Sequence, residues 1–292
     1  MIVILTALGI EQDAVLEHLV GATVHEHNKG TLFDVGAITG HPGHRVAVGV
    51  TGAGTTTAAA LTERAGAEFS PTAMMFVGIA GGLRDKLDLG DVVVATKVHS
   101  YQGGRSENDE FLVRPRSWEL SHRLDQKARR LCRGNGWYDW LSEQARAAEP
   151  KVSFAPIAVG DVVLDSTTSE LARRIRTSFN DAVAVEMEGS GFAHAAALAD
   201  QVPAVVVRGI SDHANGRKAQ DDRAGNQLIA ARNAAAFAIA LAVSLEPQTD
   251  SATESPSPMA PSLPPIHNTM TARDHATVGE QIGVQFNNWG QK

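Results

Sequence analysis

The stretch "AVAVEMEGSGFAHAAALADQVPAVVVRGISD", Ala182 to Asp212, contains the pattern that decides the fold. An apolar run predicts a strand at Ala182–Glu186, and small residues with alanines predict a helix at Gly189–Ala199. A second apolar run predicts another strand at Ala204–Ile210. Both strands are apolar almost throughout, as is usual for strands covered on two faces. The order strand, helix, strand is typical of a parallel crossover unit.

The same alternation of apolar runs and helical segments extends over the first 245 residues. The other predicted strands are Ile2–Ala7, Leu32–Ile38, Arg45–Val50, Ala73–Gly78, Asp91–Val98 and Val152–Val159. The other predicted helices are Glu11–Val20, Thr55–Ala67, Trp118–Arg133, Thr168–Ser178 and Ala224–Leu245. These elements predict a three-layer α/β/α sandwich with a mixed, mostly parallel central sheet.

The composition changes after Leu245. Residues 246–272 hold six of the twelve prolines and many serines and threonines, which predicts an extended linker. Residues 273–292 are too few to form their own core, so we expect a disordered C-terminal tail, with a partner-binding peptide as the alternative. The chain therefore divides into a catalytic domain at 1–245, the linker at 246–272 and the tail at 273–292.

Composition and charge exclude several classes of protein. The net charge of −7 gives no electrostatic footprint for nucleic acid. The single cysteine, Cys132, excludes an internal disulfide and a cysteine-based zinc cluster, and fits a cytoplasmic protein. No apolar run is expected to reach the ~18 residues that span a bilayer. The histidines lack regular ligand spacing, so we expect no metal and no cofactor.

Two glycine-rich segments follow predicted strands. "VTGAG", Val50–Gly54, precedes the helix at Thr55, and "FVGIAGG", Phe76–Gly82, contains Ala80 and Gly81. Glycine lets the backbone approach a ligand closely, and a helix N-terminus offers unpaired N–H groups. A flat base could lie against the backbone of the second segment. The structural alternative is a plain tight turn for the first segment, and a strand with a glycine bend and a hairpin-like return for the second.

Carboxylates follow three of the predicted strands. Glu11 lies after the first strand in "TALGIEQD", Glu186 and Glu188 close the strand of "VEMEG", and Asp212 follows "VVVRGIS". Open α/β sheets bind ligands at the carboxyl ends of their strands, so these side chains are expected at one edge. One of the two glutamates could cap the helix at Gly189. A second carboxylate suits the vicinal hydroxyls of a ribose, because it accepts two hydrogen bonds.

These pieces, in this order, resemble the nucleoside phosphorylase/nucleosidase superfamily, and within it the 5′-methylthioadenosine/S-adenosylhomocysteine nucleosidases. The resemblance covers about residues 1–245. It rests on "TALGIE", "TGAG", "GIAGGL…LGDVVV", "VGD", "VEMEG" and "VVVRGISD". It implies a nucleoside phosphorylase-like fold and an enzyme that cleaves the N-glycosidic bond of an adenine nucleoside, with water as co-substrate.

The resemblance also implies roles on the sugar side of the site. Glu11 would polarise the attacking water, and Glu186 would lie near that water. Glu188 would bind the ribose hydroxyls, with Met187 packed against the sugar.

On the base side, the resemblance makes Asp212, positioned by Ser211, the general acid that protonates the five-membered ring of the purine. Backbone around Val163 and Leu164 would recognise the adenine edge. Val163 stands where these nucleosidases usually carry a phenylalanine that stacks on adenine, which leaves the stacking partner open.

Other reactions remain possible on the sequence alone. Phosphorylases of the superfamily hold phosphate with arginines, which "TALGIEQD" and "MMFVGIAGG" lack, so hydrolysis is favoured. Arg105, Arg114 and Arg116 could decorate a loop or could accept the phosphates of AMP or ATP, as in a nucleosidase effector of a bacterial defence system. A non-catalytic nucleoside sensor is the alternative outside the enzymes. The resemblance further implies a homodimer in which the neighbour completes the 5′ side of the pocket, while the tail could recruit a protein partner.

Overall fold

The structure, a computed structural model, describes residues 1–108, 110–199 and 202–245. The predicted linker and tail lie outside the described residues. The strands are β1 Ile2–Thr6, β2 Leu19–Glu26, β3 Leu32–Ile38, β4 His41–Val50, β5 Ala73–Gly82, β6 Val92–Ser100, β7 Gly104–Ser106, β8 Phe111–Val113, β9 Arg116–Glu119, β10 Val152–Val159, β11 Ala184–Glu186 and β12 Ala204–Asp212. The helices are α1 Gly9–Leu16, α2 Thr55–Phe69, α3 His122–Cys132, the 3₁₀ turn η1 Gly136–Trp140, α4 Glu143–Ala147, α5 Glu170–Ser178, α6 Gly189–Leu198, α7 Lys218–Arg223 and α8 Asn226–Val243.

The central sheet is mixed, which confirms the predicted fold class. Its order is β11-β10-β6-β12-β5-β1-β4-β3-β2, with β9 added beside β6. The strands from β12 through β5 and β1 to β4 pair in parallel, as do β6, β10 and β11. The antiparallel pairs of this sheet are β12 with β6, β9 with β6, β11 with β5, and the sequential strands β2, β3 and β4.

Five strands of this sheet close into a ring, a feature that the predicted three-layer sandwich did not include. The short strand β11 pairs with β10 in parallel and with β5 in antiparallel orientation, through Ala184 and Gly82. Since β5, β12, β6 and β10 are already neighbours, this second pairing completes the ring. The carboxyl ends of β5, β11 and β12 are thereby brought close together.

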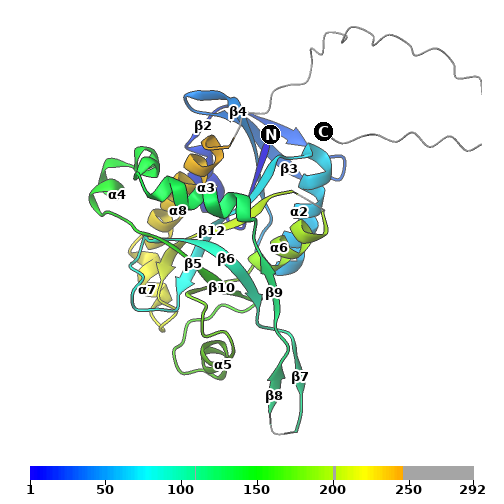
Figure 1. Ribbon diagram of the computed structural model, residues 1–292, viewed down its shortest axis with the longest axis vertical. Coiled ribbons are helices and arrows are strands. Elements are labelled where there is room, and N and C mark those ends of the chain that lie inside the picture. The colour runs from blue at the N-terminus through cyan, green and yellow to red at the C-terminus, as the bar shows by residue number, and fades with distance from the viewer. Residues whose placement is uncertain (109, 200–201, 246–292) are drawn as a thin grey trace, which may run out of the picture. The chain divides into compact units, whose positions relative to one another are not determined.

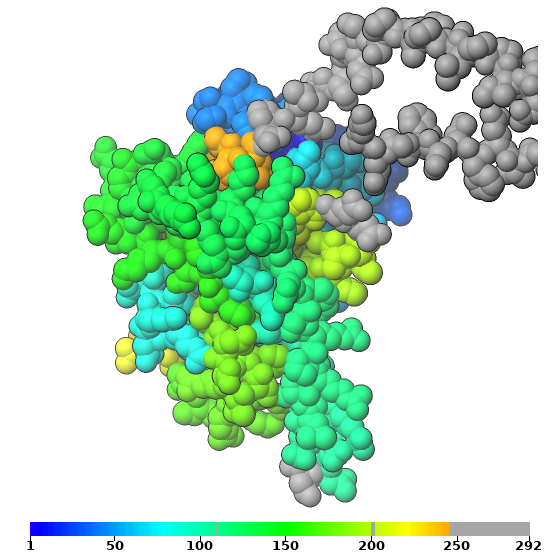
Figure 2. All heavy atoms as spheres, in the orientation of Figure 1, coloured from blue at the N-terminus to red at the C-terminus, as the bar shows by residue number. Residues whose placement is uncertain are grey.

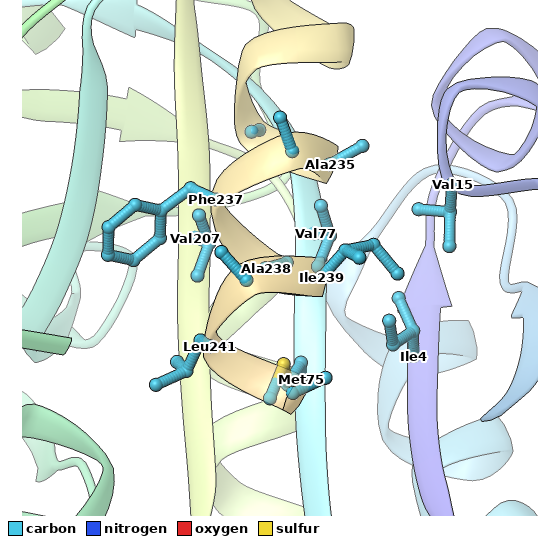
Figure 3. Close-up of a cluster of buried hydrophobic side chains, with 14 of the residues drawn as sticks. Ile4, Val15, Met75, Val77, Val207, Ala235, Phe237, Ala238, Ile239 and Leu241 are labelled. Atoms are coloured by element: carbon cyan, nitrogen blue, oxygen red, sulfur yellow. The ribbon is translucent and has the colours of Figure 1, made fainter. Parts of the chain in front are cut away.

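Helices cover both faces of the sheet, as predicted (Figure 1). One core packs α1, α3 and α8 against the strands, and the other packs α2 and α6 against the opposite face. In the first core, Ile239 and Phe237 of α8 lie against Val77, Val207 and Met75 (Figure 3). The alanines of α8 allow this close packing, because their side chains are small.

We expected no apolar run long enough to span a membrane, and by the criteria of length and composition this expectation is wrong. The helix α8 is long and apolar enough to do so, although 67% of it is buried inside the protein. That burial is what the core helix of a globular domain shows.

The predicted bounds of two helices differ from the observed ones. The first helix ends at Leu16, and Leu19–Glu26 forms the edge strand β2 instead. Most side chains of β2 are at least partly exposed, so the strand lacks the apolar pattern that would have revealed it. Trp118 belongs to β9, where it pairs with Val98 of β6, and the helix begins after Ser121, whose hydroxyl accepts the N–H of Leu124.

Two of the strands that lead to the site continue past their predicted carboxyl ends. The strand β5 continues past Gly78 to Gly82, and β12 continues past Ile210 to Asp212. Asp212 is paired with Gly81 across the two strands, after a local register shift. Asp212 therefore belongs to the sheet and not to the turn that follows it.

Candidate active site

A cavity of about 280 Å³ opens at the carboxyl ends of β1, β5, β11 and β12. All ten residues singled out from the sequence line it: Glu11, Ala80, Gly81, Val163, Leu164, Glu186, Met187, Glu188, Ser211 and Asp212. The other lining residues are Ala7, Leu8, Ala53, Ile79, Val162, Val185, Lys218 and Gln227. The structure thus brings the predicted residues together, while the role of each one stays a prediction.

Glu11 is buried in the first turn of α1 and is fixed by three backbone donors. Its Oε2 accepts the N–H groups of Ala7 at 2.7 Å and Leu8 at 2.9 Å, and its Oε1 accepts that of Ile79 at 2.8 Å. Burial raises the pKa of this carboxyl, against the opposing effects of Arg208 and the three N–H groups. A carboxylate with a raised pKa accepts a proton more readily near neutral pH, which suits the activation of water.

Arg208 is a buried cation at this site that the sequence interpretation missed. It lies in β12 with a fully buried side chain, and its guanidinium contacts Glu186 and lies 3.6 Å from Glu188 Oε2. The guanidinium also lies over the ring of Phe76, 4.6 Å from its centroid. Burial would lower the pKa of Arg208, but the charges of the surrounding glutamates raise it, so it stays a cation.

The side chains of Arg208 and Glu11 leave no room for a side chain at Gly78. A Cβ at Gly78 would collide with Nη1 of Arg208 and with Oε1 of Glu11. The glycine of "FVGIAGG" is therefore needed to seat an arginine and a glutamate. The sequence had suggested a turn or an approach to a ligand instead.

The two glutamates of "VEMEG" have different contacts. Glu186 accepts the N–H groups of Glu188 at 3.0 Å and Gly189 at 2.9 Å, so it is Glu186 that caps α6. Because Glu186 also holds Arg208, its oxygens are largely occupied, and its predicted place beside the attacking water stays a prediction.

Glu188 keeps more of its capacity to accept hydrogen bonds. Its Oε1 accepts the N–H of Gly54 at 3.1 Å, and its Oε2 faces Arg208 only at 3.6 Å. Burial and the charge of Glu186 raise the pKa of Glu188 to about 7, although Arg208 opposes them. A lining carboxylate with free lone pairs is suited to accept hydrogen bonds from two hydroxyls.

Asp212 lies on the other side of the cavity and is buried. Its Oδ2 accepts the Ser211 hydroxyl at 3.0 Å and the Lys218 ammonium at 2.9 Å, and its Oδ1 accepts the N–H of Ala214 at 2.9 Å. The contact with Ser211 agrees with the predicted positioning. Lys218, the first residue of α7, was not predicted. Burial would lower the pKa of Lys218, but the contact with Asp212 and the charge of Asp222 raise it.

The loop that carries Val162, Val163 and Leu164 is held by hydrogen bonds at both ends. At one end, Asp161 accepts the N–H of Thr55 at 2.8 Å and its hydroxyl at 3.0 Å. At the other end, Asp165 accepts the N–H of Gly216 at 2.6 Å. The loop therefore joins the glycine-rich turn before α2 to the turn after β12, and its residues Val162, Val163 and Leu164 line the cavity.

The arginines considered as phosphate ligands lie elsewhere. Arg105 is in β7, where its Nε lies 3.1 Å from Glu107, and neither Arg114 nor Arg116 lines the cavity of the described chain. The hairpin β7–β8 projects from the body of the protein (Figure 2). Over residues 1–108, 110–199 and 202–245, no group of three or more histidine, cysteine or acidic side chains is placed to hold a metal ion.

Comparisons with known proteins agree with this architecture. A family model described as "Phosphorylase superfamily" matches residues 1–244. The ATP nucleosidase Cap17 of Escherichia coli strain KTE188 is 29% identical over 247 residues, covering 74% of this chain and 46% of that protein. The aminodeoxyfutalosine nucleosidase of Campylobacter jejuni is 29% identical over 225 residues, covering 76% of this chain and 89% of that protein.

A solved structure supports the fold. The 5′-methylthioadenosine/S-adenosylhomocysteine nucleosidase of Neisseria meningitidis, in complex with methylthio-immucillin-A, aligns with a TM-score of 0.69 at 23% identity. The alignment covers 84% of this chain and 99% of that one. The chain therefore spans nearly the whole of this neighbour, but about half the length of the ATP nucleosidase.

Proposed function

Because the chain belongs to the phosphorylase superfamily, we propose that it is a nucleosidase. It hydrolyses the N-glycosidic bond of an adenine nucleoside of the methylthioadenosine or adenosylhomocysteine type, giving free adenine and a ribose derivative. One observation carries the proposal. Glu11, Glu188 and Asp212 line a single cavity, in which Glu11 is held by three backbone N–H groups and Asp212 is paired with the Lys218 ammonium.

The charges of the cavity suit this reaction. Cleavage of the bond builds positive charge on the ribose and negative charge on the base. Glu11, Glu186 and Glu188 surround one guanidinium, so the sugar side has an excess of negative charge that stabilises the developing cation. Glu11 can take a proton from the water that attacks the anomeric carbon.

Water is favoured over phosphate as the nucleophile. No arginine is among the described residues that line the cavity, and the side chain of Arg208, which contacts Glu186 and Glu188, is fully buried. A phosphate dianion beside three carboxylates would be repelled. This agrees with the absence of arginine from the two strand-end motifs.

An ATP nucleosidase activity is the second candidate, and the similarity to the E. coli ATP nucleosidase favours it. The charge of the cavity argues against it, because four carboxylates and one lysine line the site. The rest of the lining is mostly apolar, which suits an uncharged 5′ substituent: Ala7, Leu8, Ala53, Ile79, Val162 and Val185.

The test is an assay of the full chain on methylthioadenosine, adenosylhomocysteine, adenosine, AMP and ATP, following free adenine with and without phosphate. We expect release from the first two substrates without phosphate, and a loss of about 10²–10⁴-fold in Glu11→Gln. Ribose 1-phosphate formed only with added phosphate would establish a phosphorylase. Preference for ATP would establish the second candidate, and binding without release would establish a sensor. The homodimer, the tail partner, the defence role and the cytoplasmic location stay predictions.

A further inference from the structure

A second cavity, of about 270 Å³, adjoins the catalytic cavity described above. The two cavities share Leu164. The chain passes from the lining of the first to the lining of the second between Gly81 and Gly82, and again between Asp212 and His213. The other walls of the second cavity come from the loop after β5, the loop before α5 and α5 itself. The second cavity is therefore built largely from the segments that follow the catalytic residues along the chain.

The charge of the second cavity is opposite to that of the catalytic cavity. Arg84 and Arg176 line it together with one carboxylate, Asp85, whereas four carboxylates and one lysine line the catalytic cavity. Over residues 1–108, 110–199 and 202–245, neither Arg84 nor Arg176 forms an ion pair. The protein has a net charge of −7, so this cavity attracts anions to a molecule that repels them overall.

Arg84 is held in place without being neutralised. Its Nε donates to the carbonyl of Ala182 at 3.1 Å, and its Nη2 donates to the carbonyl of Asn180. These carbonyl oxygens orient the guanidinium but carry no net charge, so the cation stays available to a ligand. A side chain that is already fixed loses little further entropy when it binds, which favours affinity.

The neutral side chains of the second cavity also present donors to it. The Ser166 hydroxyl oxygen accepts the N–H groups of Thr168 at 3.2 Å and Ser169 at 3.0 Å, which leaves its O–H free to donate. Asn215 Oδ1 accepts the N–H of Arg217 at 3.2 Å, which leaves its NH₂ group. Because these oxygens are used within the protein, the lining suits a ligand that accepts hydrogen bonds.

We propose that the second cavity binds a small organic anion through Arg84 and Arg176, with Ser166 and Asn215 as neutral donors. The anion carries a phosphate or a carboxylate group. The oxygens of an ionised phosphate or carboxylate accept hydrogen bonds, and a guanidinium binds either group in a bidentate manner. The anion is a separate ligand from the nucleoside, because Arg84 and Arg176 do not line the catalytic cavity.

The bound anion contacts segments that also form the catalytic cavity. Ala214 lines the second cavity, and its N–H donates to Asp212 Oδ1 at 2.9 Å in the first. Leu164 lines both, and the next residue, Asp165, accepts the N–H of Gly216 at 2.6 Å. An anion that orders this loop and this turn should therefore strengthen adenine binding, and adenine should strengthen anion binding by the same factor. This coupling rests on the proposed function, whereas the anion site itself does not.

The test is isothermal titration calorimetry of the full chain at low ionic strength, with sulfate and succinate as probes. We expect saturable binding of one anion per chain. Arg176→Met should raise the Kd about 10–100-fold, because it removes charge-assisted hydrogen bonds. Arg173→Met is the matched control, since Arg173 is an exposed cation of the same helix that does not line the cavity, and it should leave the Kd unchanged. Tighter binding of sulfate would identify phosphate as the recognised group, and tighter binding of succinate a dicarboxylate.

A second titration, with saturating adenine present, tests where the anion binds and whether the cavities are coupled. We expect the Kd of the anion to fall about 5-fold or more. Displacement of the anion by adenine would place it in the catalytic cavity and overturn the proposal, as would equal Kd values in Arg176→Met and Arg173→Met. An unchanged Kd would overturn the coupling alone. A chain that releases adenine from no nucleoside would overturn the proposed function, while the two arginine variants would still decide the anion site.

Discussion

The sugar side and the base side of the cavity are built in different ways. On the sugar side, Glu11 and Glu186 are held by backbone N–H groups and close around Arg208, whose side chain has no exposed surface. On the base side, Val163 is 59% exposed, and Lys218 reaches Asp212 from a separate short helix. Substitutions on the sugar side should therefore affect folding as well as catalysis, whereas those on the base side should affect catalysis and binding with little effect on folding.

The largest effect is expected for Arg208→Met. The change leaves Glu186 and Glu188 buried without their cation, and breaking a buried pair in this way typically costs about 3–5 kcal/mol. Urea denaturation of the variant measures this loss in the free energy of unfolding. The matched control is Arg232→Met, since Arg232 pairs with Glu17 on the surface and such pairs are worth about 0–1 kcal/mol. Equal losses in the two variants would contradict a special role for the buried cluster.

Glu188→Gln tests the charge of the sugar side through its pH dependence. The pKa of Glu188 is raised from 4.5 to about 7, so the folded protein binds more protons than the unfolded chain between these values. Stability from this group is complete below about pH 4.5 and is lost as the pH rises through about 7. At pH 8 the variant lacks the buried charge and should be more stable than wild type by about 1–3 kcal/mol.

The same variant separates stability from function. The gain in the free energy of unfolding should shrink at pH 5, where wild-type Glu188 is largely neutral. Adenine release should fall at least about 10-fold at both pH values, because an amide accepts fewer hydrogen bonds from ribose hydroxyls. Thermal melts and base-release assays at the two pH values measure both effects. A gain in stability that is independent of pH would show that the charge of Glu188 is not its cause.

The difference between the two sides also explains what the sequence could reveal. The acids were found because each follows an apolar run, and strand ends meet at one edge of a sheet. Arg208 was overlooked because it is a single polar residue inside such a run. A signal did exist, because an arginine in a fully buried strand needs an acidic partner. One helix cap requires only one of the two carboxylates of Glu186 and Glu188, so the other was available as that partner. Which acids it pairs with depends on contacts such as that with Glu11, 197 residues away along the chain.

The arrangement of residues on the base side depends on tertiary contacts, which local sequence patterns do not reveal. Lys218 lies only six residues after Asp212, but "HANGRKAQ" indicates a turn, and nothing in it shows that α7 folds back onto the strand. The extension of β12 to Asp212 was missed for a similar reason, since Ser211 and Asp212 are polar. The pairing of Asp212 with Gly81 in β5, which is distant in sequence, keeps these polar residues in a strand.

The smallest effect is expected for Val163→Phe, on the exposed base side. Val163 lines the cavity and is 59% exposed. The resemblance to the nucleosidases implies that a phenylalanine usually stands at this position and stacks on adenine. Stacking of an aromatic ring on adenine is worth about 0.5–1.5 kcal/mol, so KM should fall about 2–10-fold. Because Glu11, Glu188 and Lys218 are untouched, kcat should change little, and the melting temperature should stay the same.

Val163→Leu is the matched control for this change, since it adds apolar volume without a π face. Steady-state kinetics of the two variants on methylthioadenosine separate stacking from simple burial of apolar surface. If Val163→Leu lowers KM as much as Val163→Phe, the gain comes from burial. A fall in stability in either variant would mean that the loop carrying Val163 contributes to folding as the sugar side does, and the distinction between the two sides would then fail.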